Sequence, residues 1–129
     1  MREEAKWWID DAQRSLMKAE KNFELTFYED CVFQCQQSLE KLFKGLIMHL
    51  RRERPEKTHK LTKLYSKLER YVKLDEEQQD FLAQISGYYF IARYPDIAMG
   101  MPIEIISKKF ASDSLKKTRR IFNAFKKLH

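Results

Sequence analysis

The residues best suited to chemistry gather where one predicted helix ends. Between Gly87 and Asp96, a group of aromatic residues is followed by Arg93, Tyr94 and Asp96. Arginine provides a bidentate clamp for phosphate and tyrosine a plane on which a base can stack, the contacts most useful for a nucleotide or single-stranded RNA. Alternatively, the tyrosines are core residues and Arg93 ties down the next loop through Asp96. Packing explains the tyrosines better than it explains Arg93.

Two lysines lie at helical spacing in an earlier segment. Lys41 and Lys44 follow Gln37 beside a stripe of leucines, so their amines can reach a groove between helices. The alternative is an ordinary surface ion pair between Lys44 and Glu40, one turn apart, which stabilises a helix by a few tenths of a kcal/mol. From the spacing alone we favour the surface pair.

One histidine follows a predicted helix cap. Thr58 is expected to cap a helix that begins with His59 and continues through Leu61. A lone histidine at a helix start more often caps or packs than acts as a base. If His59 faced the same groove as Arg93, however, an imidazole would suit general acid or base work on a ribose hydroxyl, because it titrates near neutral pH.

Several enzyme classes are excluded by what the chain lacks. Three scattered glycines cannot form a phosphate-binding loop of either the Walker or the dinucleotide type. The three histidines form neither an HExxH pair nor facing ExxH pairs, so we expect no metal site and no cofactor. Cys31 and Cys35 are four residues apart, which fits neither a CxxC redox pair nor a zinc knuckle. We expect them to be reduced and semi-buried.

The elements that must position these residues are helices. The chain has 129 residues with only three glycines and three prolines, which allows one domain over residues 1–129 and nearly excludes an all-β fold. Apolar residues recur at steps of three and four, with Asp75 and Ser107 as expected N-caps. The predicted helices cover residues 8–23, 29–52, 58–71, 75–93 and 107–125, with a loop over 96–106. We therefore predict an all-α, up-and-down antiparallel bundle of four to five helices.

Hydropathy indicates the cellular location of the protein, and the distribution of charge indicates a candidate binding surface. The longest stretch without a charged residue, Phe81–Ala92, is shorter than a membrane span, and the N-terminus lacks signal-peptide features, so we expect a cytoplasmic protein without membrane contact. The net charge is +6, yet residues 105–129 carry +7 and the remainder −1. The last helix is thus a candidate surface for phosphates or an acidic partner, or a solvated face that maintains solubility.

Three blocks of residues resemble one known family. The segment Gln36–Leu46 resembles a QQxxEKxxKxxL helix, residues 58–61 resemble a THxL block, and residues 92–96 resemble an RYPD element. An N-terminal Trp followed by Ala, as at Trp8 and Ala12, is also similar. The chain resembles a HEPN domain, the higher-eukaryote-and-prokaryote nucleotide-binding family, of the stand-alone prokaryotic type. The likeness extends over almost the whole chain.

The resemblance implies a helical bundle that is usually a homodimer and works with a minimal nucleotidyltransferase in a toxin–antitoxin or stress-response pair. Many members of the family are metal-independent ribonucleases with an Arg-x(4-6)-His motif, in which arginine steadies phosphate and histidine moves protons. Here Arg93 is followed at the required distance by Ala98, Met99 and Gly100, so the motif is not preserved. Arg54 and His59 fit the spacing formally but lie in the THxL region.

Three hypotheses follow. The leading one is a nucleotide- or RNA-binding module in which Lys41, Lys44 and Arg93 contact phosphate, Tyr94 stacks, and His59 and Asp96 complete the polar network. The second is a metal-independent ribonuclease with His59 as base and Arg93 or Arg54 as phosphate stabiliser. The third is a non-catalytic interaction module that docks through basic residues of the last helix. Those residues are Lys116, Lys117, Arg119 and Arg120.

Overall fold

The computed structural model describes residues 2–99 and 106–129, and all regular structure within them is helical. This confirms the all-α prediction. The helices are α1 (Glu3–Glu24), α2 (Tyr28–Arg51), α3 (Leu61–Tyr65), α4 (Glu76–Ser86), α5 (Tyr88–Ile91), α6 (Pro95–Ala98), α8 (Lys108–Phe125) and a final 3-10 turn, η1 (Lys126–Leu128).

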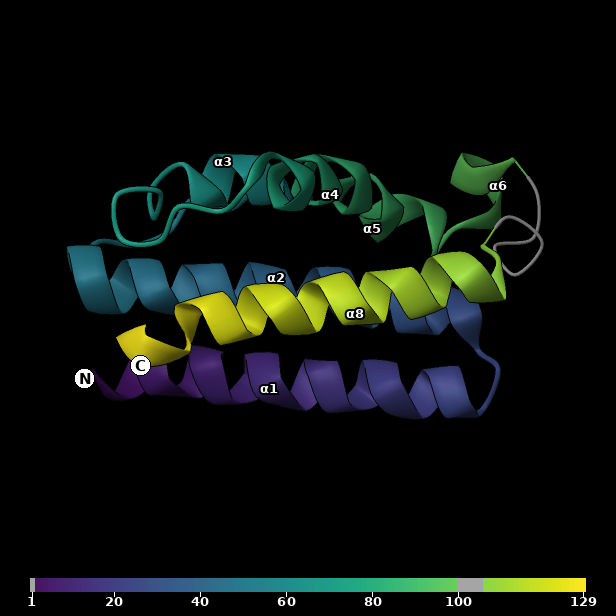
Figure 1. Cartoon of the computed structure of the whole chain (residues 1–129), viewed down its shortest axis with the longest axis horizontal. Helices are drawn as coiled ribbons and strands as arrows, with labels where there is room; N and C mark the ends of the chain where they lie inside the picture. The colour runs from purple at the N-terminus through teal and green to yellow at the C-terminus, as the bar shows by residue number, and fades with distance from the viewer. Residues whose placement is uncertain (1, 100–105) are drawn as a thin grey trace.

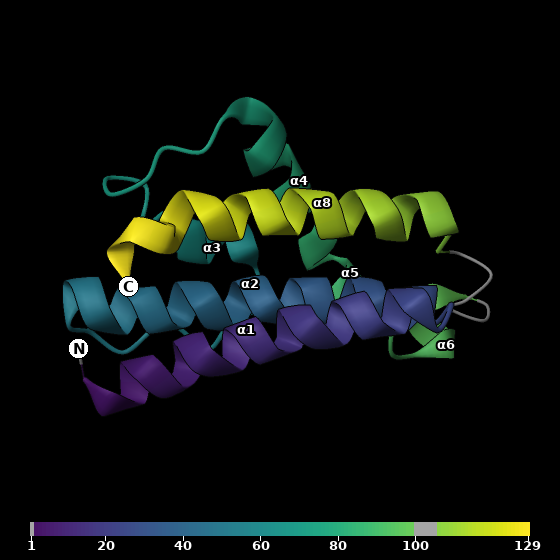
Figure 2. The ribbon, with the colours of Figure 1, turned by 60° about the horizontal axis from the view of Figure 1, so that its bottom comes forward.

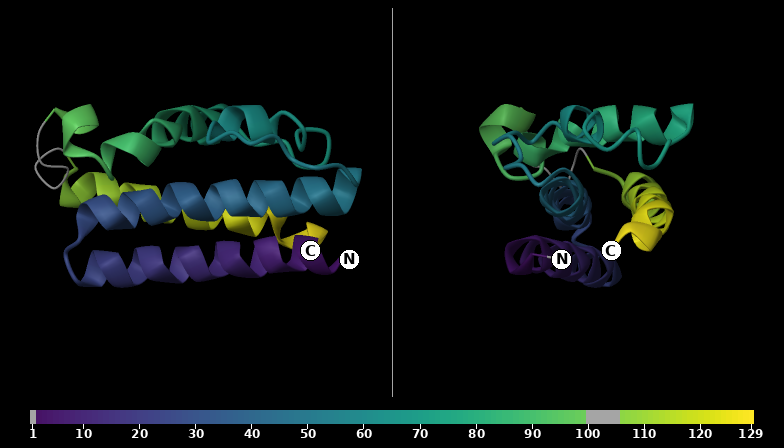
Figure 3. Two further views of the ribbon diagram at one scale, coloured as in Figure 1. Left: turned by 180° about the vertical axis from the view of Figure 1, so that it is seen from behind. Right: turned by 90° about the vertical axis from the view of Figure 1, so that its left-hand side faces the viewer.

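The helices form an up-and-down bundle around α2. In Figure 1, α1 and the α3–α6 series run in one direction, and α2 and α8 run in the other. The end-on view in Figure 3 places α2 between α1 below, α8 to one side and the α3–α6 layer above. Because α2 has neighbours around most of its circumference, it supplies the largest share of the core.

Helix α1 packs directly along α2 through small residues. The positions of α1 that are buried include Ala5, Ala12 and Ala19, and Gly45 of α2 faces the first turns of α1 near Ala5. A Cβ atom on Gly45 would lie 2.8 Å from the Ile9 Cγ1 atom, so only glycine permits this approach. The larger residues predicted to line this face, such as Trp8, lie half-buried beside it. Figure 2 shows α1 crossing α2 at a small angle.

The layer above α2 differs from the sequence prediction at its first helix. Helix α3 has only the five residues Leu61–Tyr65, and its N-cap is Lys60 rather than Thr58. The Thr58 hydroxyl instead accepts a hydrogen bond from the Lys60 backbone N–H at 3.2 Å, within the loop that carries His59. The predicted cap is therefore wrong, because the chain enters the helix two residues later.

The later helices of this layer are shorter than predicted. Asp75 caps α4 as expected, in a capping box completed by Gln78. The predicted continuous helix to residue 93 is interrupted at Gly87, and the short helices α5 and α6 follow. Part of the predicted loop over 96–106 is therefore helical, while residues 100–105 lie outside the described part of the chain.

Of the other predictions, the cap of the last helix is confirmed, while the burial of the two cysteines differs. Ser107 caps α8, and its hydroxyl accepts a hydrogen bond from the Phe110 N–H at 3.1 Å. Cys31 and Cys35 are both free thiols, more deeply buried than expected, and this burial raises the pKa of the Cys35 thiol. Across the described ranges, no helix combines the length and apolar character needed to cross a membrane.

Candidate functional site

A buried carboxylate is the centre of the site. Glu40 lies in the middle of α2 and accepts hydrogen bonds from three groups. The Gln36 Nε2 atom is 3.0 Å away and the Lys44 Nζ atom also 3.0 Å, both one turn along the same helix. The His59 Nδ1 atom, from the loop before α3, lies 2.9 Å from Glu40 Oε1. Glu40 therefore fixes a histidine that is far away in the sequence.

The pair between Glu40 and Lys44 is buried, which corrects the surface pair favoured from the spacing. The two side chains are only 8% and 10% exposed. The physical reason is the central position of α2, because α1 and the loop before α3 cover this part of it. The Lys44 ammonium also lies 5.8 Å from the ring centre of Trp8 in α1, a cation–π contact.

The hydrogen bonds keep Glu40 ionised despite its burial. Burial acts to raise the pKa of this carboxyl, but the hydrogen bonds from Gln36, His59 and Lys44 and the charge of Lys44 outweigh it, so the pKa lies below the ordinary value of 4.5. A carboxylate at Nδ1 favours the His59 tautomer with its proton on Nδ1. The Nε2 atom is then the ring nitrogen that can accept a proton.

An aromatic surface lies directly against His59. Tyr89 of α5 stacks on the imidazole, with ring centres 3.7 Å apart and an angle of 13° between the planes. Phe90 meets the imidazole edge-on at 6.1 Å. The His59 side chain remains 42% exposed, so the stacked ring is open to solvent on part of its surface.

Arg93 completes the set from the exit of α5. Its Nη1 atom donates a hydrogen bond to the Tyr89 hydroxyl at 2.9 Å. Its guanidinium carbon lies 5.2 Å from the ring centre of Phe33 and 5.3 Å from each of the Tyr89 and Tyr94 rings. Arg93 is therefore held by aromatic rings around it while its side chain remains exposed. Its recorded partner is Tyr89 rather than the predicted Asp96.

The structure thus joins residues from three separate segments into one chain of contacts, which we call the His59 cluster. It runs from α2 through the loop before α3 to α5 and the two residues before α6. Its members are Phe33, Gln36, Glu40, Lys44, His59, Tyr89, Phe90, Arg93 and Tyr94.

Other predicted site residues lie elsewhere. The Lys41 Nζ atom pairs with Asp11 at 2.8 Å and donates to the Ser15 hydroxyl at 2.9 Å, so it links α2 to α1. Asp96 is exposed in α6. Arg54, the alternative phosphate stabiliser, is 84% exposed and lies 3.9 Å from Glu4. Its contact is therefore with α1 rather than with the His59 cluster.

Sequence reasoning missed two residues on which the cluster depends. Glu40 and Tyr89 were placed in an ion pair and in a core, respectively, although they are the two groups that hold His59. A signal was present for Glu40, because it lies inside the QQxxEK block next to Gln36. For Tyr89 the only signal was its spacing of four from Arg93, which on a helix brings the two side chains together.

Comparison with known proteins shows to which family of helical bundles this chain belongs. The family model of the HEPN domain matches residues 5–128, nearly the whole chain, so the chain belongs to the HEPN family. This confirms the resemblance drawn from the three sequence blocks.

Two solved structures share the fold of this chain. The chain is similar to TT1696 from Thermus thermophilus, with a TM-score of 0.85, 25% identity, and 99% of this chain and 100% of that chain covered. It also shares its fold with ST0689, described as an archaeal HEPN homologue, with a TM-score of 0.76, 24% identity and both chains fully covered. A search of curated proteins found no match.

Proposed function

We propose that the chain binds a nucleotide or single-stranded RNA at the His59 cluster. Arg93 contacts phosphate, and Tyr94 and Phe90 provide the surfaces on which a base stacks. The supporting observation is the contact chain from Glu40 through His59 and Tyr89 to Arg93. An exposed cation fixed beside exposed aromatic rings suits a ligand that has both a phosphate and a planar base.

The two lysines have different roles in this proposal from those their spacing suggested. The ammonium of Lys44 is paired with buried Glu40 and is nearly inaccessible, so it positions Glu40 and, through it, His59. Lys41 is paired with Asp11, which offsets its charge, so it links α2 to α1 rather than contacting the ligand. Asp96 lies at the start of α6, where its carboxylate can interact with a ribose hydroxyl.

The direct test is isothermal titration of the protein with ATP, GTP and a short RNA at low salt. We expect binding of at least one of them that weakens as salt rises. The Arg93→Ala variant should weaken this binding by roughly tenfold or more. Arg70→Ala is the matched control, because Arg70 also lies over a tyrosine ring, 5.5 Å from Tyr71, but away from the cluster. Absence of heat with all three ligands would contradict the proposal.

The geometry of His59 supports a second candidate, a metal-independent ribonuclease. A base oriented by a carboxylate and placed near a cation is the arrangement that general-base catalysis needs. Here Glu40 orients His59, and Arg93 is linked to the same tyrosine that stacks on it. In this reading His59 takes the proton from a ribose 2′-hydroxyl, whose oxygen bonds to the adjacent phosphorus as the bond from phosphorus to the 5′-oxygen breaks. The leaving 5′-oxygen takes a proton from water, and Arg93 stabilises the charge that develops on phosphate.

Cleavage of RNA in the presence of EDTA tests the second candidate. His59→Gln should abolish cleavage while retaining most of the binding, because Arg93 and the aromatic surface remain. Intact RNA after long incubation with the wild-type protein would remove the ribonuclease and leave the binding proposal standing.

The family also motivates two proposals about partners. We expect a homodimer, which light scattering after size exclusion would detect as twice the 15.6 kDa chain mass. We also expect a minimal nucleotidyltransferase partner within a toxin–antitoxin or stress-response pair. Co-purification with the product of a neighbouring gene of that class tests this expectation, and the third hypothesis, docking through α8, predicts the same complex without nucleotide binding.

A further inference from the structure

A groove between α1 and α2 lies next to the His59 cluster and shares one residue with it. Its volume is about 540 Å³, within the range typical of ligand sites. The shared residue is Phe33, whose ring contacts both Arg93 and Tyr89. The groove is lined by Arg14, Met17, Lys18, Lys21, Asn22, Asp30, Phe33 and Gln34.

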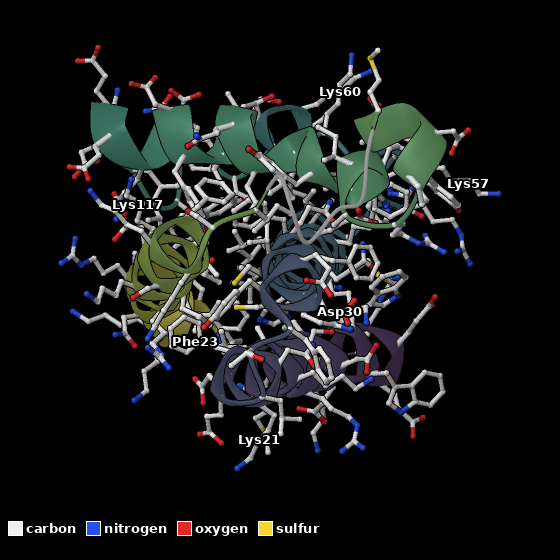
Figure 4. The ribbon with its side chains drawn as sticks, turned by 90° about the vertical axis from the view of Figure 1, so that its right-hand side faces the viewer. Lys21, Phe23, Asp30, Lys57, Lys60 and Lys117 are labelled. Atoms are coloured by element: carbon white, nitrogen blue, oxygen red, sulfur yellow. The ribbon has the colours of Figure 1, made fainter. Side chains whose placement is uncertain are left out.

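The groove is rich in positive charge. Arg14 and Lys18 are four residues apart on α1, so their side chains lie on one face of the helix, and both are exposed. The third cation, Lys21, pairs with Glu24 at 3.3 Å. Figure 4 shows Lys21 below the α1 ribbon and Asp30 above it. The charge available to a ligand therefore comes chiefly from Arg14 and Lys18, with the Asp30 carboxylate opposing it.

The remaining lining groups suit a nucleotide more than an isolated anion. Phe33 presents a ring at the boundary between the groove and the cluster, and Asn22 and Gln34 provide amide groups that can donate to and accept from a base. Aromatic rings beside a cationic track are the features with which proteins hold successive nucleotides of a single strand.

We infer that this groove binds a second nucleotide of a single-stranded RNA whose first nucleotide occupies the His59 cluster. The strand passes over Phe33, and Arg14 and Lys18 contact the neighbouring phosphate. This inference rests on the proposed function and deepens it, because it makes the preferred ligand a polymer rather than a mononucleotide.

The test compares AMP with an oligoadenylate of about eight nucleotides, a length within the range that one single-strand site covers. Wild-type protein should bind the oligonucleotide more tightly than AMP. The double variant Arg14→Gln/Lys18→Gln should weaken oligonucleotide binding roughly tenfold and leave AMP binding unchanged. The slope of log K against log salt should fall by about 1.4, because two fewer phosphates of a single strand are neutralised.

The matched control is Lys116→Gln/Arg120→Gln on α8. It removes the same charge at the same helical spacing from exposed positions far along the sequence. Equal weakening by the control and the groove variant would overturn the inference, as would oligonucleotide binding that the groove variant leaves intact. In both cases AMP binding would still support the proposed function, whereas failure of AMP and the oligonucleotide alike would contradict both.

Discussion

The His59 cluster and helix α8 use positive charge in opposite ways. Residues 105–129, which include α8, carry a charge of +7 against −1 for the rest of the chain, yet their basic side chains are largely exposed, and the Arg119–Glu20 pair is 47% and 39% exposed. The cluster has only Lys44 and Arg93, but a buried carboxylate and four aromatic rings hold their surroundings in place. Figure 4 shows Lys117 of α8 on the opposite side of the molecule from Lys57, which precedes His59 by two residues.

The contrast between α8 and the cluster shows that the number of charges and the way they are held in place are different properties. Exposed lysines and arginines create a potential that speeds the approach of anions, but they lose side-chain entropy when they fix a ligand. A guanidinium already held among rings loses less. We therefore expect the cluster to determine affinity for nucleotide and α8 to affect mainly the rate of encounter.

The largest effect should come from removing Glu40. Glu40→Ala leaves the Lys44 ammonium buried without its partner, and breaking a buried pair costs about 3 kcal/mol of unfolding free energy. Glu20→Ala, which breaks the exposed pair to α8, should cost less than about 1 kcal/mol. Urea unfolding of both variants measures the contrast, and equal losses would show that the cluster is no better organised than the α8 surface.

Removing the exposed cation of the cluster should weaken ligand binding without unfolding the protein. Arg93→Ala should weaken AMP binding by roughly tenfold or more, because a charge-assisted hydrogen bond contributes about 1.5–3 kcal/mol. Its stability should change little, since Arg93 is exposed. Titration calorimetry of Arg93→Ala beside Arg70→Ala gives the comparison, and unchanged affinity in Arg93→Ala would place the ligand elsewhere.

Acid should weaken the cluster selectively. The pKa of Glu40 is lower in the folded protein than its ordinary value of 4.5, so the unfolded chain binds more protons between these two values. The stabilisation is complete above the ordinary value and is lost as pH falls through the folded pKa. Wild-type unfolding free energy should therefore drop more steeply with acid than that of Glu40→Gln. Parallel pH curves for the two proteins would contradict this account.

The smallest effect should follow from neutralising α8. Replacing Lys116, Lys117, Arg119 and Arg120 with Gln should change the affinity for AMP less than about twofold, because long-range charge acts mostly on association rate. Stopped-flow measurement should show slower association at low salt that converges with wild type at high salt. A large loss of equilibrium affinity would instead identify α8 as the binding surface.

The sequence predicted much of the frame and the cluster but not how the cluster is held together. Helical spacing, the caps at Asp75 and Ser107 and the three motif blocks depend on neighbours within a few residues. The burial of the Glu40–Lys44 pair and the bond from Glu40 to His59 do not, because a Glu–Lys pair one turn apart looks the same on a surface helix as on a central one. Only the packing of α1 and the His59 loop over α2 decides between those cases.

Tyr89 illustrates the same limit. Its helical spacing from Arg93 can be read from neighbouring residues. Its stacking on His59 requires α5 to lie over α2, and the spacing of apolar residues does not reveal that position. Lys41 is the converse case. Its spacing places it on the same helix face as Lys44. In the structure, however, its ammonium is bound by Asp11 and Ser15 of α1.

The most direct test follows side-chain NMR signals of His59 and Arg93 while AMP is added to the wild-type protein. We predict saturable shifts in the His59 imidazole and Arg93 guanidinium signals with one shared dissociation constant, while those of Arg119 and Arg120 stay in place. Shifts confined to the α8 arginines, or none at His59 and Arg93, would contradict the assignment of the ligand to the cluster.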